Sequence, residues 1–106
     1  MNFLKLQDEY SKYIGTDYGI STNTGTSALH LALEALEFNE GDEVIVPQFT
    51  MIASAWAVTY AGLKPVFVDC DDTFCMDVNL IEKKITKKTK EIVPVHFTGY
   101  MTNMPS

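Results

Sequence analysis

The sequence has little positive charge. Its eight basic residues stand against fourteen acidic ones, and the formal net charge of the 106 residues is −6. A nucleic-acid-binding domain would want a basic face, so that class of function is not expected. No apolar run approaches the ~20 residues of a membrane span, and the N-terminus lacks the charged and then apolar layout of a signal peptide. We therefore expect a cytoplasmic protein with no nucleic-acid or membrane partner.

Cysteine is also scarce. Cys70 and Cys75 lie close together with no His nearby in the sequence, which excludes zinc-type spacing and favours two free thiols. The acidic loop from Asp69 to Asp77 lacks the Gly and the Glu that an EF-hand needs at its sixth and twelfth positions. We therefore expect solvated carboxylates there and no metal site. Internal repeats, low-complexity tracts and linkers are absent too. The length of 106 residues allows one domain at most.

The residues that are present predict an α/β fold. Apolar content of 46% excludes a disordered tail. Helices are predicted over 2–14, 26–38, 51–61 and 77–85, and extended segments over 17–22, 43–47, 65–69 and 91–95. Strands that alternate with helices form a mainly parallel sheet with helices on both faces.

Three features sharpen this expectation. The helix over 26–38 is apolar nearly all round, so we expect it to be buried on most sides. The strand over 43–47 is apolar without alternation, which is typical of a strand covered on both faces. Thr50 and Asp77 are predicted to cap the helices that follow them, and Gly15 and Gly62 to end the helices that precede them.

The stretch from Asn23 to His30 is the strongest candidate site. A Gly followed by two hydroxyl residues at a helix start leaves backbone N–H groups free beside the positive end of the helix dipole. Gly25 has no Cβ, so a ligand can approach the backbone, and the hydroxyls of Thr26 and Ser27 can donate to phosphate oxygens. Such residues also cap helices without any ligand, and this alternative stays open.

Other loops should join this one. In open parallel sheets ligands bind beyond the carboxyl ends of the strands, a position that fits the loops 23–27, 48–51 and 96–100. His96 could reach a ligand there, although a structural His hydrogen-bonded within its own loop is the favoured interpretation. His30 is expected to pack or cap. Trp56 and Tyr60, four residues apart on one helix, are expected in the core or at a subunit interface.

The sequence resembles a known protein family. Residues 23–33, 41–47, 50–55, 65–69, 85–90 and 94–100 follow the order and spacing of the DegT/DnrJ/EryC1/StrS aminotransferases, which act on nucleotide-linked keto sugars. The resemblance covers essentially the whole chain. Around residues 52–54 and 58–60 the amino-acid sequence is most similar to perosamine synthase members of the family.

The resemblance implies a fold type I pyridoxal-phosphate (PLP) enzyme and a homodimer with active sites at the subunit interface. Residues 1–106 would be the N-terminal part of its PLP-binding large domain. By resemblance, Gly25, Thr26 and Ser27 bind the phosphate of the cofactor. Met51 stands where the family usually carries an aromatic side chain on the pyridine ring. A Met thioether can also cover a ring, because sulfur–aromatic contacts are worth about 0.3–1.5 kcal/mol.

The family's chemical residues are not found in this chain. The lysine that forms a Schiff base with the cofactor and the Asp at the pyridine nitrogen both lie downstream in the family. The lysines seen here lie at turns or on a charged helix face, so we assign no catalytic residue. The chain alone is expected to be inactive, whereas the complete enzyme would bind a nucleotide sugar and an amino-acid donor.

Three alternatives stay open. The chain could be a non-catalytic interaction domain that uses an exposed half-fold surface. It could instead belong to a dehydratase or a regulator of the same family. A third alternative is a flavodoxin-like domain that binds another phosphate ligand.

Overall fold

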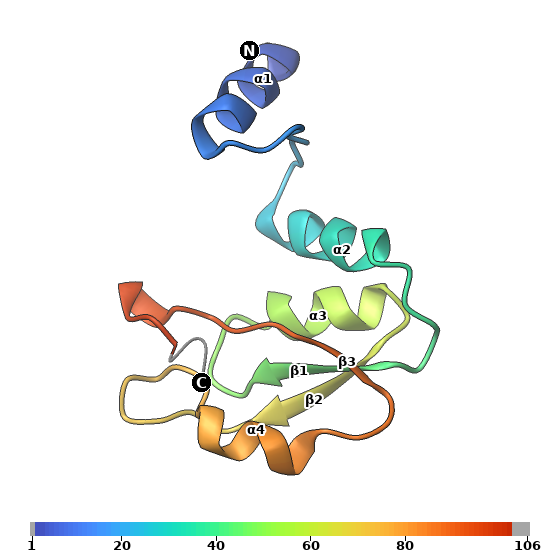
Figure 1. Cartoon of the computed structure of the whole chain (residues 1–106), viewed down its shortest axis with the longest axis vertical. Coiled ribbons are helices and arrows are strands. Elements are labelled where there is room, and N and C mark those ends of the chain that lie inside the picture. Colours follow the sequence, from blue (N-terminus) through green and yellow to red (C-terminus); the bar gives the residue numbers. More distant parts are fainter. Residues whose placement is uncertain (1, 103–106) are drawn as a thin grey trace.

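The computed structural model describes residues 2–102 and confirms an α/β chain with a parallel sheet. The elements in chain order are α1 (Phe3–Ile14), α2 (Gly25–Ala35), β1 (Glu43–Pro47), α3 (Ala53–Tyr60), β2 (Lys64–Val68), α4 (Val78–Lys84), β3 (Thr89–Ile92) and the 3₁₀ turn η1 (Phe97–Gly99). The strand order is β2-β1-β3, and both outer strands run parallel to β1. Figure 1 shows α2 and α3 stacked over one face of the sheet and α4 beneath the other.

The centre of the core is β1. Its side chains alternate between the two faces, yet Val44, Ile45 and Val46 are all fully buried. One face packs in a cluster with α2 and α3, formed by Leu33, Val44, Val46, Ala57, Val58 and Leu63. Ile45 points to the other face and packs with Val68 and Met76, beside α4. The prediction of a strand covered on both faces is confirmed, because each face has its own helical layer.

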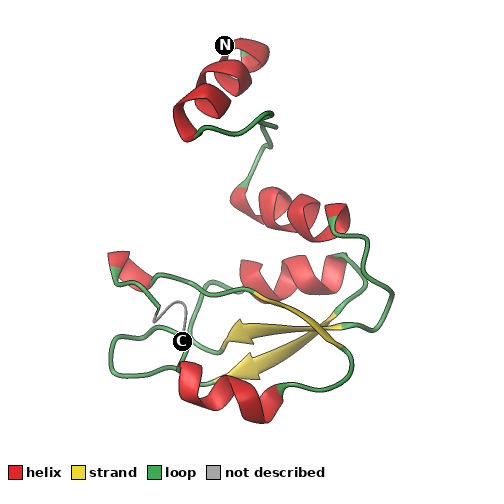
Figure 2. Cartoon of the chain, in the orientation of Figure 1, coloured by secondary structure: helices red, strands yellow, loops and turns green. Residues whose placement is uncertain are grey.

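The expected burial of α2 is wrong. Leu33 is its one buried residue, while Leu31 and Leu36 each expose nearly half of their surface. In Figure 2, α2 lies on α3 rather than on the sheet, so only the side toward α3 is covered. The helix is also shorter than predicted, because it ends at Ala35 and the backbone at Glu37 is left-handed with φ of 55°.

The strand predicted over Asp17–Thr22 is also wrong. The segment joins no ladder, because the described residues place no strand beside it. It is held against α1 instead: the backbone N–H and the hydroxyl of Ser21 both donate to Oε1 of Gln7, at 2.9 and 3.0 Å. The turn at Asn23 therefore follows an irregular segment and not a strand.

The helix ends follow the predictions in part. Gly15 ends α1 in a left-handed conformation, and the Asp77 carboxylate accepts from the N–H of Asn79 at 2.9 Å, as a cap should. The predicted cap at Thr50 is wrong, because α3 starts at Ala53, two residues later than expected. Its N-cap is Ile52, which makes no side-chain cap hydrogen bond. The hydroxyl of Thr50 lies 3.2 Å from that of Ser54 instead.

Smaller differences complete the comparison. The last strand is Thr89–Ile92 rather than 91–95, because its register with β1 ends at Ile92 and beyond it only the N–H of Val93 still donates to β1, to the carbonyl of Ile45. Trp56 and Tyr60 each expose about half of their surface, so they are not part of the core of the described residues. Within residues 2–102 we find no helix with the length and apolar character that a bilayer crossing needs.

Candidate functional site

The turn before α2 is organised by its N-cap. Thr24 has an extended backbone, and its Oγ1 accepts from the N–H of Ser27 at 3.0 Å. The Ser27 hydroxyl is engaged as well, since it donates to Oδ1 of Asn23 at 2.9 Å and accepts from the Thr24 hydroxyl at 3.0 Å. The N–H of Ser27 is therefore not free for a ligand, and its hydroxyl would have to leave Asn23 in order to donate to one.

Two amides remain at this helix start. The N–H groups of Gly25 and Thr26 have no hydrogen-bond acceptor among the described residues, and the first backbone bond of the helix runs from Ala28 to the carbonyl of Thr24. Both residues are at least partly exposed. Amides at a helix N-terminus carry partial positive charge, so this pair fits an anionic oxygen.

Gly25 is not required by the chain itself. A Cβ built at this position meets no atom within 4 Å, and its φ lies outside the left-handed region. Glycine elsewhere in the protein serves the backbone: Gly15, Gly41, Gly62 and Gly99 all have positive φ. The open space at Gly25 lies beside the two free amides, which is where a bound anion would need it.

The predicted loops gather at one end of the molecule. In Figure 1 the start of α2, the loop after β1 and the loop around η1 all lie at the end toward which the arrowheads of β1 and β2 point. This is the edge where parallel sheets bind ligands. Met51, in the loop after β1, exposes 77% of its surface, so its side chain is open to a ligand.

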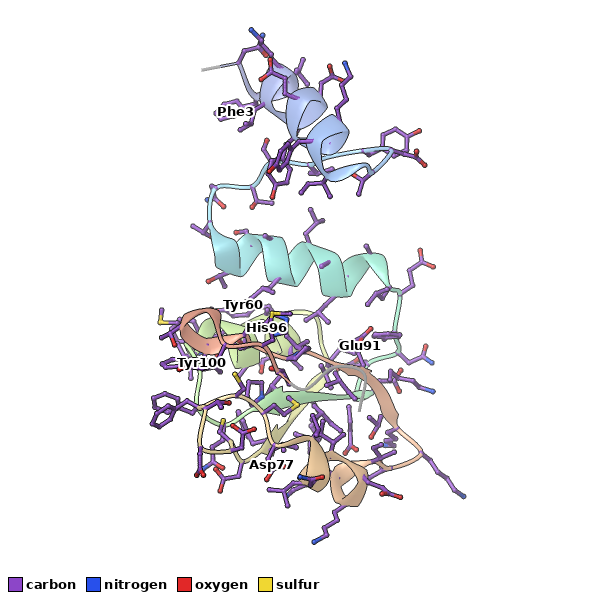
Figure 3. The ribbon with its side chains drawn as sticks, turned by 60° about the vertical axis from the view of Figure 1, so that its left-hand side comes forward. Phe3, Tyr60, Asp77, Glu91, His96 and Tyr100 are labelled. Atoms are coloured by element: carbon purple, nitrogen blue, oxygen red, sulfur yellow. The ribbon has the colours of Figure 1, made fainter. Side chains whose placement is uncertain are left out.

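His96 is hydrogen-bonded within its own loop, as the favoured interpretation expected. Its Nδ1 accepts from the N–H of Thr102 at 3.0 Å, and the hydroxyl of Thr102 donates to the carbonyl of Val95 at 3.2 Å. Thr102 is only 3% exposed. An accepting Nδ1 requires the neutral ring with its proton on Nε2. Figure 3 labels His96 and Tyr100 on this loop.

Replacing His96 with alanine should destabilise the loop. The amide of the buried Thr102 would lose its acceptor, and an unsatisfied buried donor costs about 1–3 kcal/mol. We expect the urea midpoint to fall and the Thr102 amide to exchange its hydrogen faster. Equal exchange rates in the two proteins would contradict this structural role.

His30 lies along one side of α2. Its Nε2 is 3.1 Å from Oε1 of Glu34, and its ring centroid is 5.7 Å from that of Tyr60 on α3. These contacts agree with the expected packing role. A groove of about 360 Å³ follows the same side of the helix, lined by Thr22, Asn23, Ser27, His30, Leu31 and Glu34. The groove begins at the turn that carries the free amides.

An aromatic cluster at this end was missed by the sequence analysis. Phe49, Phe74 and Phe97 pack with ring centroids 5.1–5.8 Å apart. They come from three separate loops more than twenty residues apart, so no spacing in the sequence reports them. The backbone of Phe74 is left-handed, with φ of 62°. The cluster thus joins the loop after β2 to the loops after β1 and β3.

The carboxylates of Asp69, Asp71 and Asp72 in the acidic loop are exposed to solvent. The hydroxyl and then the backbone N–H of Thr73 donate to Asp71 and hold the pKa of this carboxyl below its ordinary value. No group of three or more potential metal ligands occurs within residues 2–102. Cys70 and Cys75 are free thiols, and Cys75 is buried with its Sγ 3.4 Å from the carbonyl of Tyr100.

Comparison with known proteins decides the family. A model of the DegT/DnrJ/EryC1/StrS aminotransferase family matches residues 2–106. The chain belongs to this family. Its members among known proteins include the UDP-N-acetyl-3-dehydro-alpha-D-glucosamine 3-aminotransferase of Acidithiobacillus ferrooxidans, which is 52% identical over 101 residues. That match covers 94% of this chain and 27% of the relative.

Two further relatives show the breadth of this aminotransferase family. GDP-perosamine synthase of Caulobacter vibrioides is 47% identical over 95% of this chain and 28% of its own length. A protein of Geobacillus stearothermophilus named pleiotropic regulatory protein is 44% identical over 94% of this chain and 27% of its own length. The chain therefore spans about a quarter of the length of these relatives.

Solved structures of family members superpose on the chain. DesV of S. venezuelae, solved with a ketimine intermediate, matches with a TM-score of 0.88 and 41% identity over 96% of this chain and 28% of its own. The sugar aminotransferase Spr1654 of Streptococcus pneumoniae, in its PLP form, matches with a TM-score of 0.87 and 43% identity over 95% of this chain and 26% of its own. The predicted relation to fold type I aminotransferases is confirmed.

Proposed function

We propose that the chain is the N-terminal part of the large domain of a PLP-dependent aminotransferase that acts on a nucleotide-linked keto sugar. In this proposal it supplies the seat for the phosphate of the cofactor. The observation that carries it is the pair of amides at Gly25 and Thr26, which have no acceptor in a chain that matches PLP-bound relatives almost throughout. The fit is chemical as well, because a dianion suits a helix N-terminus.

Each residue of the seat has its own part. The amides of Gly25 and Thr26 would donate to phosphate oxygens, and the Thr26 hydroxyl could add a third hydrogen bond. Thr24 and Asn23 hold the turn in shape through Ser27. Ser27 could donate to the phosphate only if its hydroxyl turns away from Asn23. The exposed thioether of Met51 would lie against the face of the cofactor ring.

The complete protein would need further residues for chemistry. When bound, PLP would supply an electron sink; a lysine would hold the cofactor and a carboxylate beside its ring nitrogen would support that role. The lysines of this chain lie outside the proposed seat, so none is given that role. We therefore expect the chain alone to bind the phosphate without catalysing transfer. A nucleotide sugar, an amino-acid donor and a second subunit belong to the proposal for the complete enzyme.

Gly25→Ala tests the seat. The added methyl group meets no protein atom, so stability should stay equal or rise by up to about 1 kcal/mol, as for Gly to Ala in a helix. The methyl group would instead hinder a phosphate, so binding should weaken. Pyridoxamine 5′-phosphate is the appropriate probe, because it lacks the aldehyde that would react with surface lysines.

Amide shifts of Gly25 and Thr26 during the titration report the binding, and thermal unfolding reports the stability. Weaker binding together with lower stability would mean that Gly25 serves the fold and not the ligand. Unchanged binding would show that phosphate does not approach this position. Either result contradicts the proposed seat.

A regulatory role is the second candidate, favoured by the similarity to the pleiotropic regulatory protein. Both candidates use the same phosphate seat, so cofactor binding does not separate them. Amino transfer to a keto sugar by the complete protein would support the aminotransferase. A complete protein that binds the cofactor but transfers no amino group would support the regulator.

A further inference from the structure

The lysines of this chain are unevenly distributed. Residues 83–90 contain five of the eight lysines and no carboxylate, whereas the rest of the chain has three lysines against fourteen acidic residues. We call the five residues the lysine patch: Lys83, Lys84, Lys87, Lys88 and Lys90. All five are exposed. A chain of net charge −6 therefore carries one concentrated region of positive charge.

The lysine patch differs from the other three lysines in its ion pairs. Lys5 and Lys12 each pair with a carboxylate four residues away on α1, and the Nζ of Lys64 lies 3.8 Å from a carboxylate oxygen of Glu43. No lysine of the patch forms an ion pair with any residue that the structure describes. The cations of the patch are therefore available to an anion outside these residues.

The turn at the centre of the lysine patch is held in a fixed shape. The N–H of Thr86 donates to the hydroxyl of Thr89 at 2.8 Å, and the N–H of Lys88 donates to the hydroxyl of Thr86 at 3.1 Å. The carbonyl of Lys88 accepts from the N–H of Glu43 at 2.8 Å, which ties the turn to the start of β1. The Glu43 carboxylate accepts from the Thr86 hydroxyl and lies beside Lys64, so it does not neutralise the patch.

Ordinary structural roles account for only part of the lysine patch. Lys83 and Lys84 end α4, where cations interact favourably with the helix dipole. Lys90 lies on an edge strand, where a charged side chain hinders pairing with another chain. Lys87 and Lys88 lie after the helix and before the strand, so neither role applies to them. Solubility does not require them either, because the chain is already strongly negative.

The composition of this region indicates the kind of anion. The chain contains no arginine, and residues 77–95 contain no aromatic side chain. Arginine reads bases through two-point contacts and aromatic side chains stack on bases, so a nucleic acid is not favoured. Lysine is depleted in protein–protein interfaces, which argues against an acidic protein surface. A cluster of lysines acting as point charges is typical of contact with anionic lipid headgroups.

The lysine patch lies far from the candidate functional site. Figure 1 places the turn after α4 at the end of the sheet where the strands start, and Thr89 pairs there with Glu43. The start of α2 and the acidic loop after β2 lie at the opposite end. The five residues of β1 alone separate the two ends by roughly 16 Å, which exceeds the screening length of about 8 Å at physiological salt. Repulsion from the distant carboxylates is therefore largely screened.

We propose that the lysine patch docks the chain on the surface of an anionic lipid bilayer. The expectation of no membrane partner concerned spans and signal layouts, which a surface contact does not need. Ile85 lies within the patch and is 53% exposed, so it adds an apolar side chain that can enter the interfacial layer. In this orientation the seat at Gly25 faces away from the bilayer, and the contact depends neither on the cofactor nor on the proposed function.

The test measures how much of the chain sediments with lipid vesicles. Vesicles of phosphatidylcholine with about one third phosphatidylglycerol should bind the chain, whereas vesicles of phosphatidylcholine alone should not. The double variant Lys87→Gln and Lys88→Gln should bind the anionic vesicles about 25-fold more weakly, because each lysine near the surface contributes about 5-fold. Raising the salt from about 0.1 M to about 1 M should abolish binding, since the screening length falls from about 10 to about 3 Å.

The matched control is the double variant Lys5→Gln and Lys12→Gln, which removes the same charge from α1 and should bind almost as the unaltered chain does. The double variant Lys87→Arg and Lys88→Arg keeps the charge and should keep the binding, which separates charge from any change in the fold of the turn.

Several outcomes would overturn the proposal. Equal losses in the two glutamine variants would mean that net charge, and not the lysine patch, governs binding. Loss of binding in the arginine variant, binding to phosphatidylcholine alone, or no binding to the anionic vesicles would contradict it as directly. Tighter binding to single-stranded DNA or to polyglutamate than to the anionic vesicles would assign the patch to another class of partner.

Discussion

Replacing Ile45 with alanine is expected to remove a large share of the stability of the chain. Ile45 lies in the central strand β1, is fully buried, and packs against Val68 and Met76 on the face that α4 covers. Truncation of such a side chain costs about 2–5 kcal/mol, because it removes apolar burial and leaves a cavity. A domain of this length has a total stability of about 5–15 kcal/mol. Because this chain leaves many large apolar side chains exposed, we expect its stability near the lower value.

The control is Ile85→Ala. Ile85 follows α4 and exposes half of its surface, so the same change of side chain should alter the free energy of unfolding by less than about 0.5 kcal/mol. Urea unfolding followed by circular dichroism measures both variants. Equal losses in the two would mean that β1 is not the centre of the core.

The sequence could predict this core because it depends on local pattern. The apolar run at Val44, Ile45 and Val46 lacks alternation, and a strand with this pattern needs cover on both faces. Asp77 and Gly15 mark helix ends through the conformation of a few neighbouring residues, and both predictions are confirmed. Such signals do not require knowledge of distant parts of the chain.

The errors share a different cause. The segment 17–22 has the composition of a strand, but a strand exists only if another lies beside it, and none does within residues 2–102. In the same way, the apolar surface of α2 predicted burial, whereas its cover on the side away from α3 is missing from the described chain. A sequence pattern reports that a surface needs a partner, but not whether the partner is present.

The candidate site likewise has one part that the sequence predicts and another part that it does not. The turn at Gly25 is local, so its helix start and free amides follow from the order of residues. The cluster of Phe49, Phe74 and Phe97 depends on how three loops meet, and no periodicity in the sequence reports it. The engagement of Ser27 with Asn23 could not be foreseen either, because several hydroxyl and amide groups compete for the same partners.

Replacing Thr26 with aspartate should separate binding from stability most sharply. Thr26 is the second residue of α2, where a carboxylate interacts favourably with the helix dipole by about 0.3–1 kcal/mol. The same carboxylate would repel a bound dianion. At about 4 Å in a water-like dielectric the repulsion is roughly 2 kcal/mol, which weakens phosphate binding by about 30-fold. Stability and affinity should therefore change in opposite directions.

Asn79→Asp is the matched control for this variant. It places the same charge at the same position of another helix, two residues after the cap Asp77, and changes the net charge equally. Titration with pyridoxamine 5′-phosphate should leave this control close to the unaltered chain, whereas Thr26→Asp should show almost no amide shifts at Gly25. If both variants lost binding equally, the effect would come from net charge alone. If neither did, the phosphate would bind elsewhere, and the two amides at the start of α2 would be an ordinary helix end.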